Sequence, residues 1–341
     1  MVRAGLIGYG FGGRVFHAPV IGAARSVDLV AVVSSRPEAV RADLPAVEVV
    51  ADVDALLGDP SVDLVVVATP NPSHFELAAR ALRAGKHVLV EKPMVVRSEE
   101  AFALDRIARE RGVLLSAYHN RRWDGDFRTV RRIIEERRVG EVVLFESHFD
   151  RYRPGIRAGW REEPRSGSGL LYDLGSHLID QALVLLGNPE TVWADITAQR
   201  PGALVDDWFH LVLAWGETRA VLHAGTLVRD PGPRFQIHGT TGSFTTWGLD
   251  PQEARLMRGA AAPESAGEER TGRLVYGESD AAVVEDIPIP SGRYASFYDA
   301  LAAAIRGEAD NPVPAEAAAR VIRVIEAALQ SQREGRRVIL D

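Results

Sequence analysis

The sequence predicts an α/β domain with a doubly wound parallel sheet, followed by an α+β domain with an open, mainly antiparallel sheet. In the first third of the chain, short valine-rich strands alternate with helical segments, which is the pattern of repeated βαβ units. After residue 120 the strands are longer, alternate more clearly between apolar and polar residues, and follow one another through short turns. We therefore expect a first domain over residues 1–120 and a second domain over residues 121–341.

The strands of the first domain carry almost no charge, as strands buried on both faces of a sheet do. They are expected at residues 2–7, 28–34, 62–68, 87–90 and 113–117. Helices are expected at residues 53–58, 73–84 and 98–111. Asp52 and Ser98 are the expected N-caps, because their side-chain oxygens accept backbone N–H groups. Pro19 predicts that the first helix is short, kinks near His17 and then restarts.

The second domain is predicted from a helix that leads into a series of hairpins. Its strands are expected at residues 141–149, 191–198, 208–214, 219–227, 234–239 and 243–247. Its helices are expected at residues 126–136, 295–306 and 314–332. Residues 259–272, rich in Ala, Gly, Glu and Pro, are expected to form a mobile surface loop.

Composition excludes several classes of protein. The chain has 341 residues, enough for two domains, and a formal net charge of −7, which argues against a general nucleic-acid surface. It contains no cysteine, so it has no disulfide, no thiolate nucleophile and no zinc–cysteine site. No apolar run reaches the roughly 18 residues of a membrane span, and the first residues do not resemble a signal peptide. We expect a soluble cytoplasmic protein without a membrane partner.

A glycine-rich loop follows the first strand and precedes a helix. It reads Gly8-Tyr9-Gly10-Phe11-Gly12-Gly13, which contains the G-x-G-x-x-G spacing of dinucleotide-binding loops. Glycines let the backbone approach a pyrophosphate, and the helix N-terminus supplies N–H donors. The alternative is an ordinary glycine-rich turn. The position of the motif in the chain favours a nucleotide site.

The end of the second strand indicates which nicotinamide cofactor the loop binds. An NAD site has a carboxylate there for the ribose hydroxyls, whereas this chain has Ser34-Ser35-Arg36. A guanidinium can bind a 2′-phosphate through two hydrogen bonds. Ser35 and Arg36 therefore favour NADP over NAD, and the alternative is a solvated arginine in a loop.

The turn after the next strand lies where it can contact the same cofactor. Thr69, Pro70, Asn71 and His74 are candidate cofactor contacts on this ground. The turn also begins a helix that Ser73 can cap, so a purely structural role stays open. His74 is given no role in the chemistry.

Candidate catalytic residues come from two places. Lys92 ends a strand in Glu91-Lys92-Pro93, and Asp173 and His177 are spaced i, i+4 in a mostly apolar helical segment. Oxidation of an alcohol needs a base for the hydroxyl proton and a positive group near the developing alkoxide. A surface lysine and a helix-start aspartate paired with a core histidine are the structural alternatives. No third ligand with suitable spacing accompanies the pair, so we expect no metal.

Further polar and aromatic residues are candidates for binding. Asn120 and Arg122 can bind hydroxyl groups, and Trp123 can pack on a sugar ring, although these residues can equally seal a domain interface. Weaker candidates from the second domain are Tyr152, Trp160 and Arg161.

These motifs, in this order, resemble the Gfo/Idh/MocA oxidoreductase family over essentially the whole chain. Five further segments of the sequence resemble one branch of that family, the bacterial NADP-dependent scyllo-inositol 2-dehydrogenases. They are Val15-Phe16-His17-Ala18-Pro19, Ser34-Ser35-Arg36, Tyr118-His119-Asn120-Arg121-Arg122-Trp123-Asp124, Asp150-Arg151-Tyr152-Arg153-Pro154 and Tyr172-Asp173-Leu174-Gly175-Ser176-His177-Leu178-Ile179-Asp180-Gln181. Asp150 is a departure, because the branch usually has asparagine there, and this residue can alter the preference for polyols.

The resemblance implies a Rossmann domain followed by a sheet whose open face often builds dimers or tetramers. It implies that Lys92, Asp173 and His177 form the catalytic group. We further expect Glu91, Lys92, Asn120, Trp160 and Arg161 among the cofactor contacts. The expected substrate contacts are Lys92, Asn120, Arg122, Trp123, Tyr152, Asp173 and His177. The expected function is NADP-dependent interconversion of a ring hydroxyl and a ketone on scyllo-inositol or a related polyol. Two kinds of alternative stay open. Lys92 can be the base instead of His177. The protein can instead be a catalytically silent regulator, another carbonyl reductase or a cofactor-retaining glycosidase.

Overall fold

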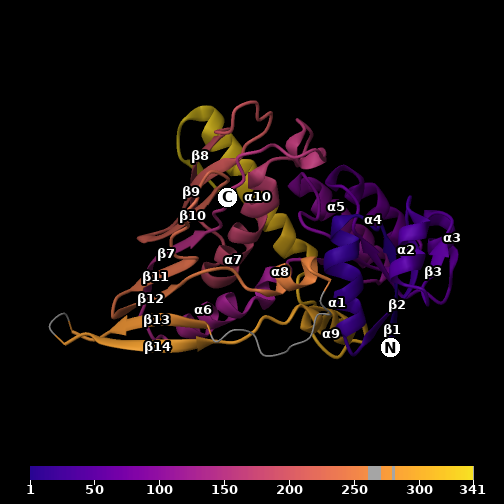
Figure 1. Cartoon of the computed structure of the whole chain (residues 1–341), viewed down its shortest axis with the longest axis horizontal. Helices are drawn as coiled ribbons and strands as arrows, with labels where there is room; N and C mark the ends of the chain where they lie inside the picture. The colour runs from indigo at the N-terminus through magenta and orange to yellow at the C-terminus, as the bar shows by residue number, and fades with distance from the viewer. Residues whose placement is uncertain (260–269, 279–280, 341) are drawn as a thin grey trace. The chain divides into compact units, whose positions relative to one another are not determined.

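The computed structural model describes residues 1–259, 270–278 and 281–340, which form two compact units (Figure 1). Unit 1 comprises Met1–Trp123, the described part of Pro251–Ser265, and Arg293–Ala319. Unit 2 comprises Asp124–Asp250, the described part of Ala266–Gly292, and the described part of Arg320–Asp341. Among the described residues, no helix is long and apolar enough to cross a membrane.

Unit 1 contains a parallel sheet that has six strands among the described residues, in the order β3-β2-β1-β4-β5-β6. The strands are β1 (Val2–Ile7), β2 (Val27–Val33), β3 (Glu48–Val50), β4 (Leu64–Val67), β5 (His87–Val90) and β6 (Leu115–Ala117). The order reverses direction beside β1, as in a doubly wound sheet. The four residues of β4 are all buried, as the uncharged sequence of the strand predicts. The prediction of a doubly wound parallel sheet is confirmed.

Most helices of unit 1 lie within two residues of the predicted bounds, but residues 37–43 and 252–257 form helices that the sequence did not predict. The helices of unit 1 are α1 (Ala18–Ala23), α2 (Pro37–Asp43), α3 (Val53–Gly58), α4 (His74–Arg83), α5 (Ser98–Arg111), α8 (Gln252–Met257) and α9 (Tyr294–Ile305). The prediction that Ser98 caps α5 is wrong, because Ser98 is its first residue and Arg97 is the N-cap. Arg97 has an extended backbone, and its N–H donates to Glu100 Oε2 over 3.3 Å. The glutamate two residues after Ser98 therefore sets where the helix begins.

The first helical segment changes type at the predicted place but is not interrupted. Gly12–His17 forms a π-helix that runs directly into α1, with Pro19 in the first turn of α1. Proline has no N–H to donate, so it is tolerated in the first turn of a helix but not in its interior. His17 is buried at the junction of the two helical segments.

Unit 2 contains a sheet that has nine strands among the described residues, in the order β14-β13-β12-β11-β7-β10-β9-β8-β15. The strands are β7 (Val142–His148), β8 (Thr191–Thr197), β9 (Trp208–Trp215), β10 (Thr218–Gly225), β11 (Phe235–Gly239), β12 (Gly242–Thr246), β13 (Arg270–Tyr276), β14 (Val283–Ile289) and β15 (Val338–Ile339). The sheet is mixed and mainly antiparallel. One pair departs from the hairpin pattern, because β7 lies parallel to β10. A parallel pair needs a long connection, and the chain between β7 and β10 contains α7, β8 and β9.

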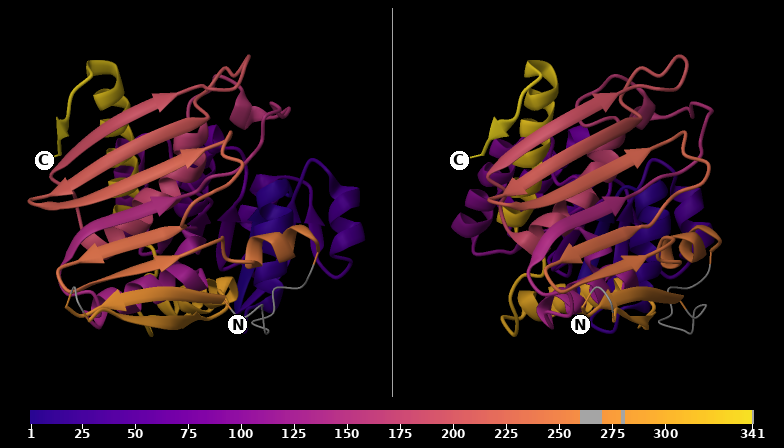
Figure 2. Two further views of the ribbon diagram at one scale, coloured as in Figure 1. Left: turned by 60° about the vertical axis from the view of Figure 1, so that its left-hand side comes forward. Right: turned by 90° about the vertical axis from the view of Figure 1, so that its left-hand side faces the viewer.

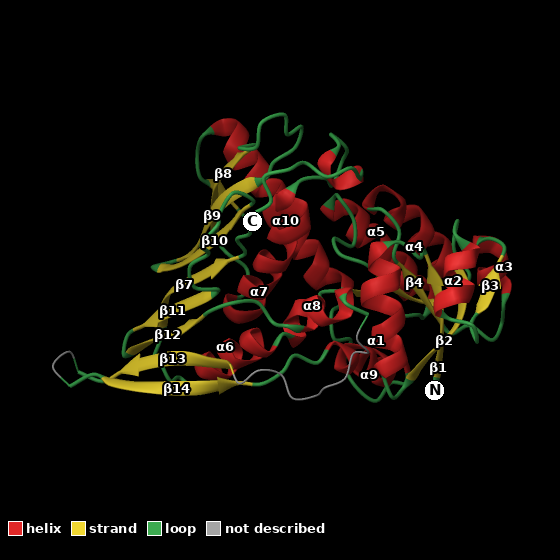
Figure 3. Cartoon of the chain, in the orientation of Figure 1, coloured by secondary structure: helices red, strands yellow, loops and turns green. Residues whose placement is uncertain are grey.

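The helices of unit 2 lie on one face of its sheet (Figure 2). They are α6 (Gly125–Glu135), α7 (Ser176–Leu186) and α10 (Ala315–Glu334), drawn in red in Figure 3. The first residues of α10 belong to unit 1. Along β9 the residues facing the helices, such as Phe209 and Leu211, are fully buried, whereas Trp208 and His210 on the other face are partly exposed. No described helix of unit 2 covers that second face.

The β13–β14 pair was not predicted from the sequence. Residues 270–272, expected in a loop, belong to β13, whereas residues 260–269 of that expected loop lie outside the described residues. β14 is an edge strand, and it carries Pro288, which only an edge or irregular position in a sheet tolerates. Proline and charges in this segment hid the alternation that predicts a strand.

Candidate active site

The glycine loop after β1 uses its glycines in different ways. Gly8 has a φ of +99°, a conformation that side-chain-bearing residues rarely adopt. A Cβ atom on Gly13 would lie 2.1 Å from the carbonyl oxygen of Gly8, so only glycine fits there. A Cβ atom on Gly10 would meet no protein atom within 4 Å. The loop is therefore tightly closed at Gly8 and Gly13 and open at Gly10, where a pyrophosphate approaches the backbone in loops of this type.

Arg36 lies against the same loop. Its Nη2 donates to the carbonyl oxygen of Tyr9 over 2.8 Å, and its backbone N–H donates to Ser34 Oγ over 3.0 Å. The structure thus places the predicted phosphate-binding arginine beside the predicted nucleotide loop.

Asp43 adds a second charged group at this loop. It accepts a hydrogen bond from Tyr9 Oη over 3.2 Å and pairs with Arg14 over 2.7 Å. Burial and the Asp43 carboxylate raise the pKa of Tyr9 to about 12. No sequence pattern signals the Arg14–Asp43 pair, because the two residues lie 29 positions apart in the chain.

The turn after β4 is fixed by its own polar groups. Ser73 Oγ donates to the carbonyl oxygen of Pro70 over 2.8 Å and lies 2.7 Å from Thr69 Oγ1. The two ring nitrogens of His74 lie 3.0 Å and 2.8 Å from the carbonyl oxygens of Pro93 and Thr69. Burial lowers the pKa of His74, and a neutral ring donates from one nitrogen only. His74 therefore donates to one of these two carbonyl oxygens, and its contact with a cofactor stays a prediction.

Glu91 lies beneath the glycine loop and beside Lys92. Its Oε2 accepts the backbone N–H of Lys92 over 2.6 Å, and a Cβ atom on Gly12 would lie 3.8 Å from its carboxylate. The Lys92-Pro93 peptide bond is cis. Burial opposes ionisation of Glu91, but His17 and Lys92 together outweigh burial and lower its pKa. The ionised carboxylate is therefore the favoured form.

His17 is the partner of Glu91 that sequence reasoning missed. Its side chain is fully buried, with Nε2 3.4 Å from Glu91 Oε1 and Nδ1 2.5 Å from Tyr298 Oη. The ring of Tyr118 packs on it with centroids 4.4 Å apart. Burial raises the pKa of Tyr298 well above its usual value, so its hydroxyl stays neutral. A lone histidine in an apolar segment gives no signal of such a partnership, because Tyr298 is 281 residues away in the chain.

In unit 2, Asp173 and His177 lie on one continuous helical segment. Asp173 belongs to a π-helix over Leu171–Gly175, which runs directly into α7 with His177 in its first turn. His177 is buried, at 5% exposure, and the Asp173 side chain is 27% exposed. The predicted helix is confirmed, and the carboxylate is accessible while the imidazole is enclosed.

Arg161 and Trp160 lie in the same part of unit 2. Arg161 Nε is 3.4 Å from Asp173 Oδ1, and the Arg161 guanidinium stacks 4.6 Å from the centre of the Trp160 ring. The structure therefore brings together three residues that the sequence proposed separately. Tyr152, also in unit 2, is 42% exposed and has the Arg229 guanidinium 3.8 Å over its ring.

The candidates around residue 120 belong to unit 1. Asn120 is buried, and Arg122 Nη1 donates to the carbonyl oxygen of Pro312 over 3.2 Å. Trp123 packs edge-on against Phe297, with ring centroids 5.0 Å apart. In the described part of the chain, no group of three or more His, Cys, Asp or Glu residues is arranged to hold a metal ion.

Two family models match the chain. Residues 2–119 match the oxidoreductase family model for an NAD-binding Rossmann fold, and residues 131–340 match the C-terminal alpha/beta domain of the same oxidoreductase family, GFO_IDH_MocA. The sequence is 43% identical over 332 residues to the uncharacterized oxidoreductase YdgJ of Escherichia coli, covering 97% of this chain and 96% of that protein.

Another relative has a named reaction. The sequence is 41% identical over 344 residues to the scyllo-inositol 2-dehydrogenase (NADP(+)) IolW of Bacillus subtilis, covering 100% of this chain and 96% of that protein. It is 32% identical over 254 residues to the 1,5-anhydro-D-fructose reductase of Ensifer adhaerens, covering 72% of this chain and 75% of that protein. The solved structure of yvaA from Bacillus subtilis superposes with a TM-score of 0.96 at 41% identity, covering 100% of this chain and 98% of that one.

Proposed function

Because the chain belongs to the Gfo/Idh/MocA oxidoreductase family, we propose that it is an NADP-dependent dehydrogenase acting on scyllo-inositol or a related polyol. It interconverts a ring hydroxyl and a ketone by hydride transfer. In this proposal residues 1–120 bind the cofactor, and residues 121–341 bind the substrate and form a homodimer or homotetramer through the open face of the sheet. The 41% identical Bacillus relative, which is named for this reaction and cofactor, supports the proposal.

The observation that carries the proposal lies within unit 1. β1 and β5 belong to one parallel sheet, so the glycine loop that follows β1 and Lys92 that follows β5 share its carboxyl edge. Ligands of doubly wound sheets bind at that edge. A nucleotide loop open at Gly10 and a lysine at the same edge fit a dinucleotide beside a group that stabilises negative charge.

The residues fit NADP in particular. Gly10 leaves the backbone open to a pyrophosphate, and Arg36, placed beside Tyr9, offers a guanidinium for a 2′-phosphate. The proposed cofactor contacts are Gly8, Tyr9, Gly10, Phe11, Gly12, Gly13, Ser35, Arg36, Thr69, Pro70, Asn71, His74, Glu91, Lys92, Asn120, Trp160 and Arg161. When bound there, NADP would supply the chemistry of hydride exchange with the substrate carbon.

The proposed chemistry uses three side chains. In the oxidation direction His177 takes the proton of the substrate hydroxyl, and Asp173, four residues earlier, orients its imidazole. Lys92 places a positive charge beside the oxygen as negative charge develops on it. Glu91 accepts the backbone N–H of Lys92, which fixes the main chain from which the lysine side chain extends. Lys92 as the base is the alternative assignment.

Substrate recognition is proposed from hydroxyl-binding and ring-packing groups. Asn120 and Arg122 bind hydroxyls, Trp123 and Tyr152 offer aromatic faces to the polyol ring, and Lys92, Asp173 and His177 bind at the reacting carbon. Reduction of a sugar ketone is a second candidate, because the Ensifer relative is named 1,5-anhydro-D-fructose reductase.

The test is NADP⁺ reduction with scyllo-inositol, run beside NAD⁺ and beside myo-inositol. We expect turnover with NADP⁺ and a preference for scyllo-inositol. Activity only with NADPH and 1,5-anhydro-D-fructose would favour the second candidate instead. His177→Ala and Lys92→Ala should each lose most turnover while still binding NADPH, and near-normal turnover in either would refute the catalytic assignment.

A further inference from the structure

Asp206 lies between β8 and β9 and binds the start of the helical segment that carries Asp173 and His177. Its Oδ2 accepts the backbone N–H of Leu171 over 2.7 Å, and its own carbonyl oxygen accepts the N–H of Leu170 over 2.9 Å. The first N–H groups of a helix have no partner within the helix, and a carboxylate there is favourable to the helix dipole. Asp206 thus caps this helix from 35 residues further along the chain.

Gly169 makes room for this carboxylate. Its φ is +89°, and a Cβ atom there would lie 2.0 Å from Asp206 Oδ1. Its N–H donates to the carbonyl oxygen of Arg161 over 3.1 Å, and its carbonyl oxygen accepts the N–H of Asp173 over 3.1 Å. Gly169 therefore joins Arg161 to the first turn of the helix at the point that Asp206 occupies.

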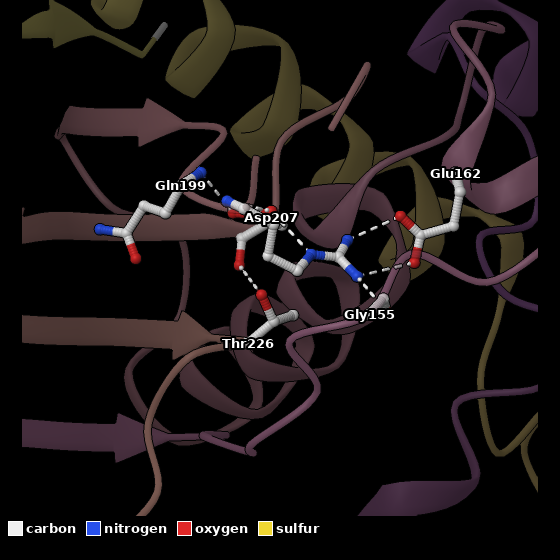
Figure 4. A network of polar contacts seen from close by, with 6 residues as sticks. Gly155, Glu162, Gln199, Asp207 and Thr226 are labelled. Carbon is white, nitrogen blue, oxygen red and sulfur yellow. Dashed lines mark hydrogen bonds and ion pairs between the residues drawn. The ribbon is translucent and has the colours of Figure 1, made fainter. Parts of the chain in front are cut away.

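Asp207, the residue after Asp206, fixes the loop that carries Arg161, the residue that contacts Asp173. Its Oδ2 accepts from Arg200 Nε over 2.8 Å, and the same guanidinium donates to Glu162 Oε2 over 2.6 Å and to the carbonyl oxygen of Gly155 over 3.2 Å. Figure 4 shows Asp207 and Glu162 on opposite sides of this network. Asp207 and Arg200 are almost fully buried, so the loop that contains Glu162 is fixed to the sheet next to Arg161.

We propose that Asp206 and Asp207 are positioning residues for the catalytic helix. Asp206 fixes the first turn on which Asp173 lies, and Asp207, through Arg200 and Glu162, fixes the loop that lays Arg161 against Asp173. The inference rests on the proposed catalytic roles of Asp173 and His177. Both carboxylates act through Asp173, which orients the imidazole.

The charge state of Asp206 gives the positioning role a pH dependence. Burial raises the pKa of Asp206 to about 6, with the Asp207 carboxylate adding to the rise and the N–H groups of Leu171 and Leu170 opposing it. An ionised carboxylate is a stronger acceptor at a helix N-terminus than a neutral carboxyl. Ionisation of Asp206 near pH 6 therefore alters its bonds to the helix, and the pH profile of turnover should contain a step near pH 6 that depends on Asp206.

The test compares Asp206→Ala and Asp206→Asn with wild type and with Asp195→Asn, an exposed aspartate on β8 of the same unit. Misplacement of a catalytic group by about 1 Å lowers turnover on the order of a hundredfold, so we expect Asp206→Ala to lower kcat about 10- to 100-fold. The KM for NADP⁺ should stay within about twofold of wild type, because a positioning loss falls on the chemical step rather than on binding. Asp206→Asn keeps an acceptor oxygen and should recover most of the turnover of Asp206→Ala, while its pH profile lacks the step near pH 6.

Deuterium uptake over residues 168–176 provides a measurement that needs no substrate. Uptake should rise in Asp206→Ala and stay unchanged in Asp195→Asn. Unchanged uptake, or kcat equal to wild type in Asp206→Ala, would overturn the positioning role. His177→Ala is measured in parallel, so that a failure of the proposed catalytic group is recognised separately from a failure of this inference. Asp207→Asn should act in the same direction, with higher uptake over residues 155–165.

Discussion

His17 and Glu91 face each other in the interior of unit 1, with Nε2 of the imidazole 3.4 Å from Oε1 of the carboxylate. The same carboxylate accepts the N–H of Lys92 and lies beneath Gly12. One largely enclosed carboxylate therefore lies next to the nucleotide loop and binds the backbone of the proposed catalytic lysine. A change at Glu91 should affect cofactor binding, turnover and stability together.

Glu91→Gln tests this link. The amide keeps the shape but removes the charge that His17 and Lys92 favour, so we expect a loss of stability of about 1–3 kcal/mol. Because the pKa of Glu91 is lowered in the folded state, its stabilisation is present above the unfolded pKa and is lost as the pH falls through the folded pKa. The difference between wild type and variant should therefore shrink in acid. Urea unfolding at pH 7 and pH 4 measures it.

Glu99→Gln is the matched control, because that side chain is exposed on α5 and pairs only with surface Arg97 among the described ion pairs. It should change the free energy of unfolding by less than about 0.5 kcal/mol. If Glu91→Gln and Glu99→Gln lower the free energy of unfolding equally, Glu91 has no special role in stability.

Gly10→Ala and Gly13→Ala separate binding from folding. A methyl group on Gly13 would collide with the Gly8 carbonyl oxygen, so this variant should fold poorly or not at all. A methyl group on Gly10 meets no protein atom, so this variant should fold normally and lose affinity for NADPH. Thermal unfolding and NADPH fluorescence titration distinguish the two effects. Gly22→Ala, also in open space but within α1, should bind NADPH as wild type does.

Arg36→Gln should raise the KM for NADP⁺ and leave that for NAD⁺ little changed. A bidentate charge-assisted contact to phosphate is worth a few kcal/mol, which corresponds to about a 10- to 100-fold change in KM. Steady-state kinetics with both cofactors measure the ratio of the KM for NADP⁺ to the KM for NAD⁺. Arg41→Gln, an exposed arginine on α2, is the control. If this ratio of KM values is the same in Arg36→Gln as in wild type, the assignment of Arg36 to the 2′-phosphate is wrong.

Asp150→Asn should destabilise the protein at neutral pH and not in acid. Burial opposes ionisation of Asp150, but His148 and His223, 3.7 Å and 3.3 Å away, outweigh it and lower its pKa to about 2. Stabilisation by a carboxylate with a lowered pKa is present above about pH 4 and is lost as the pH falls toward 2. Unfolding in urea at pH 7, 5 and 3 should show wild type and variant converging. If the difference in free energy of unfolding between wild type and variant is the same at all three pH values, the charge of Asp150 is not the cause of its stabilising effect.

Asp206→Asn should show the opposite trend. A folded pKa of about 6 exceeds the usual 3.8, so the contribution of Asp206 to stability is fully present below pH 3.8 and is lost as the pH rises through 6. Asparagine has no charge to bury, so the variant should gain stability relative to wild type between pH 4 and pH 7. Differential scanning fluorimetry across that range measures the shift. A variant that loses stability relative to wild type as the pH rises would contradict the raised pKa.

Local sequence predicted most elements of unit 1. β1 and β5 have the predicted bounds, because a short, mostly apolar run between turn residues is typical of a buried strand. The pairing of β7 with β10 was not predictable in this way. It depends on packing between segments far apart in the chain, and every strand involved has the same alternating pattern.

The candidate site was predictable where a motif carried it. The glycine loop, Lys92 and the segment bearing Asp173 and His177 each have a recognisable local pattern. His17 and Asp206 do not, because their partners are backbone or side-chain groups that only the folded chain brings close. Sequence reasoning therefore identifies groups that carry out chemistry more readily than groups that hold them in place.

The division of unit 1 into separated stretches of chain has a consequence for synthesis on the ribosome. Tyr298 and Phe297, which pack on His17 and Tyr118, lie in α9, near the end of the chain. The Rossmann sheet can therefore assemble early during translation, but its interior is completed only when α9 has emerged. For a designer who exchanges cofactor modules between relatives, the piece to transplant is the N-terminal segment together with Arg293–Ala319, since the N-terminal segment alone would leave these aromatic rings without their neighbours.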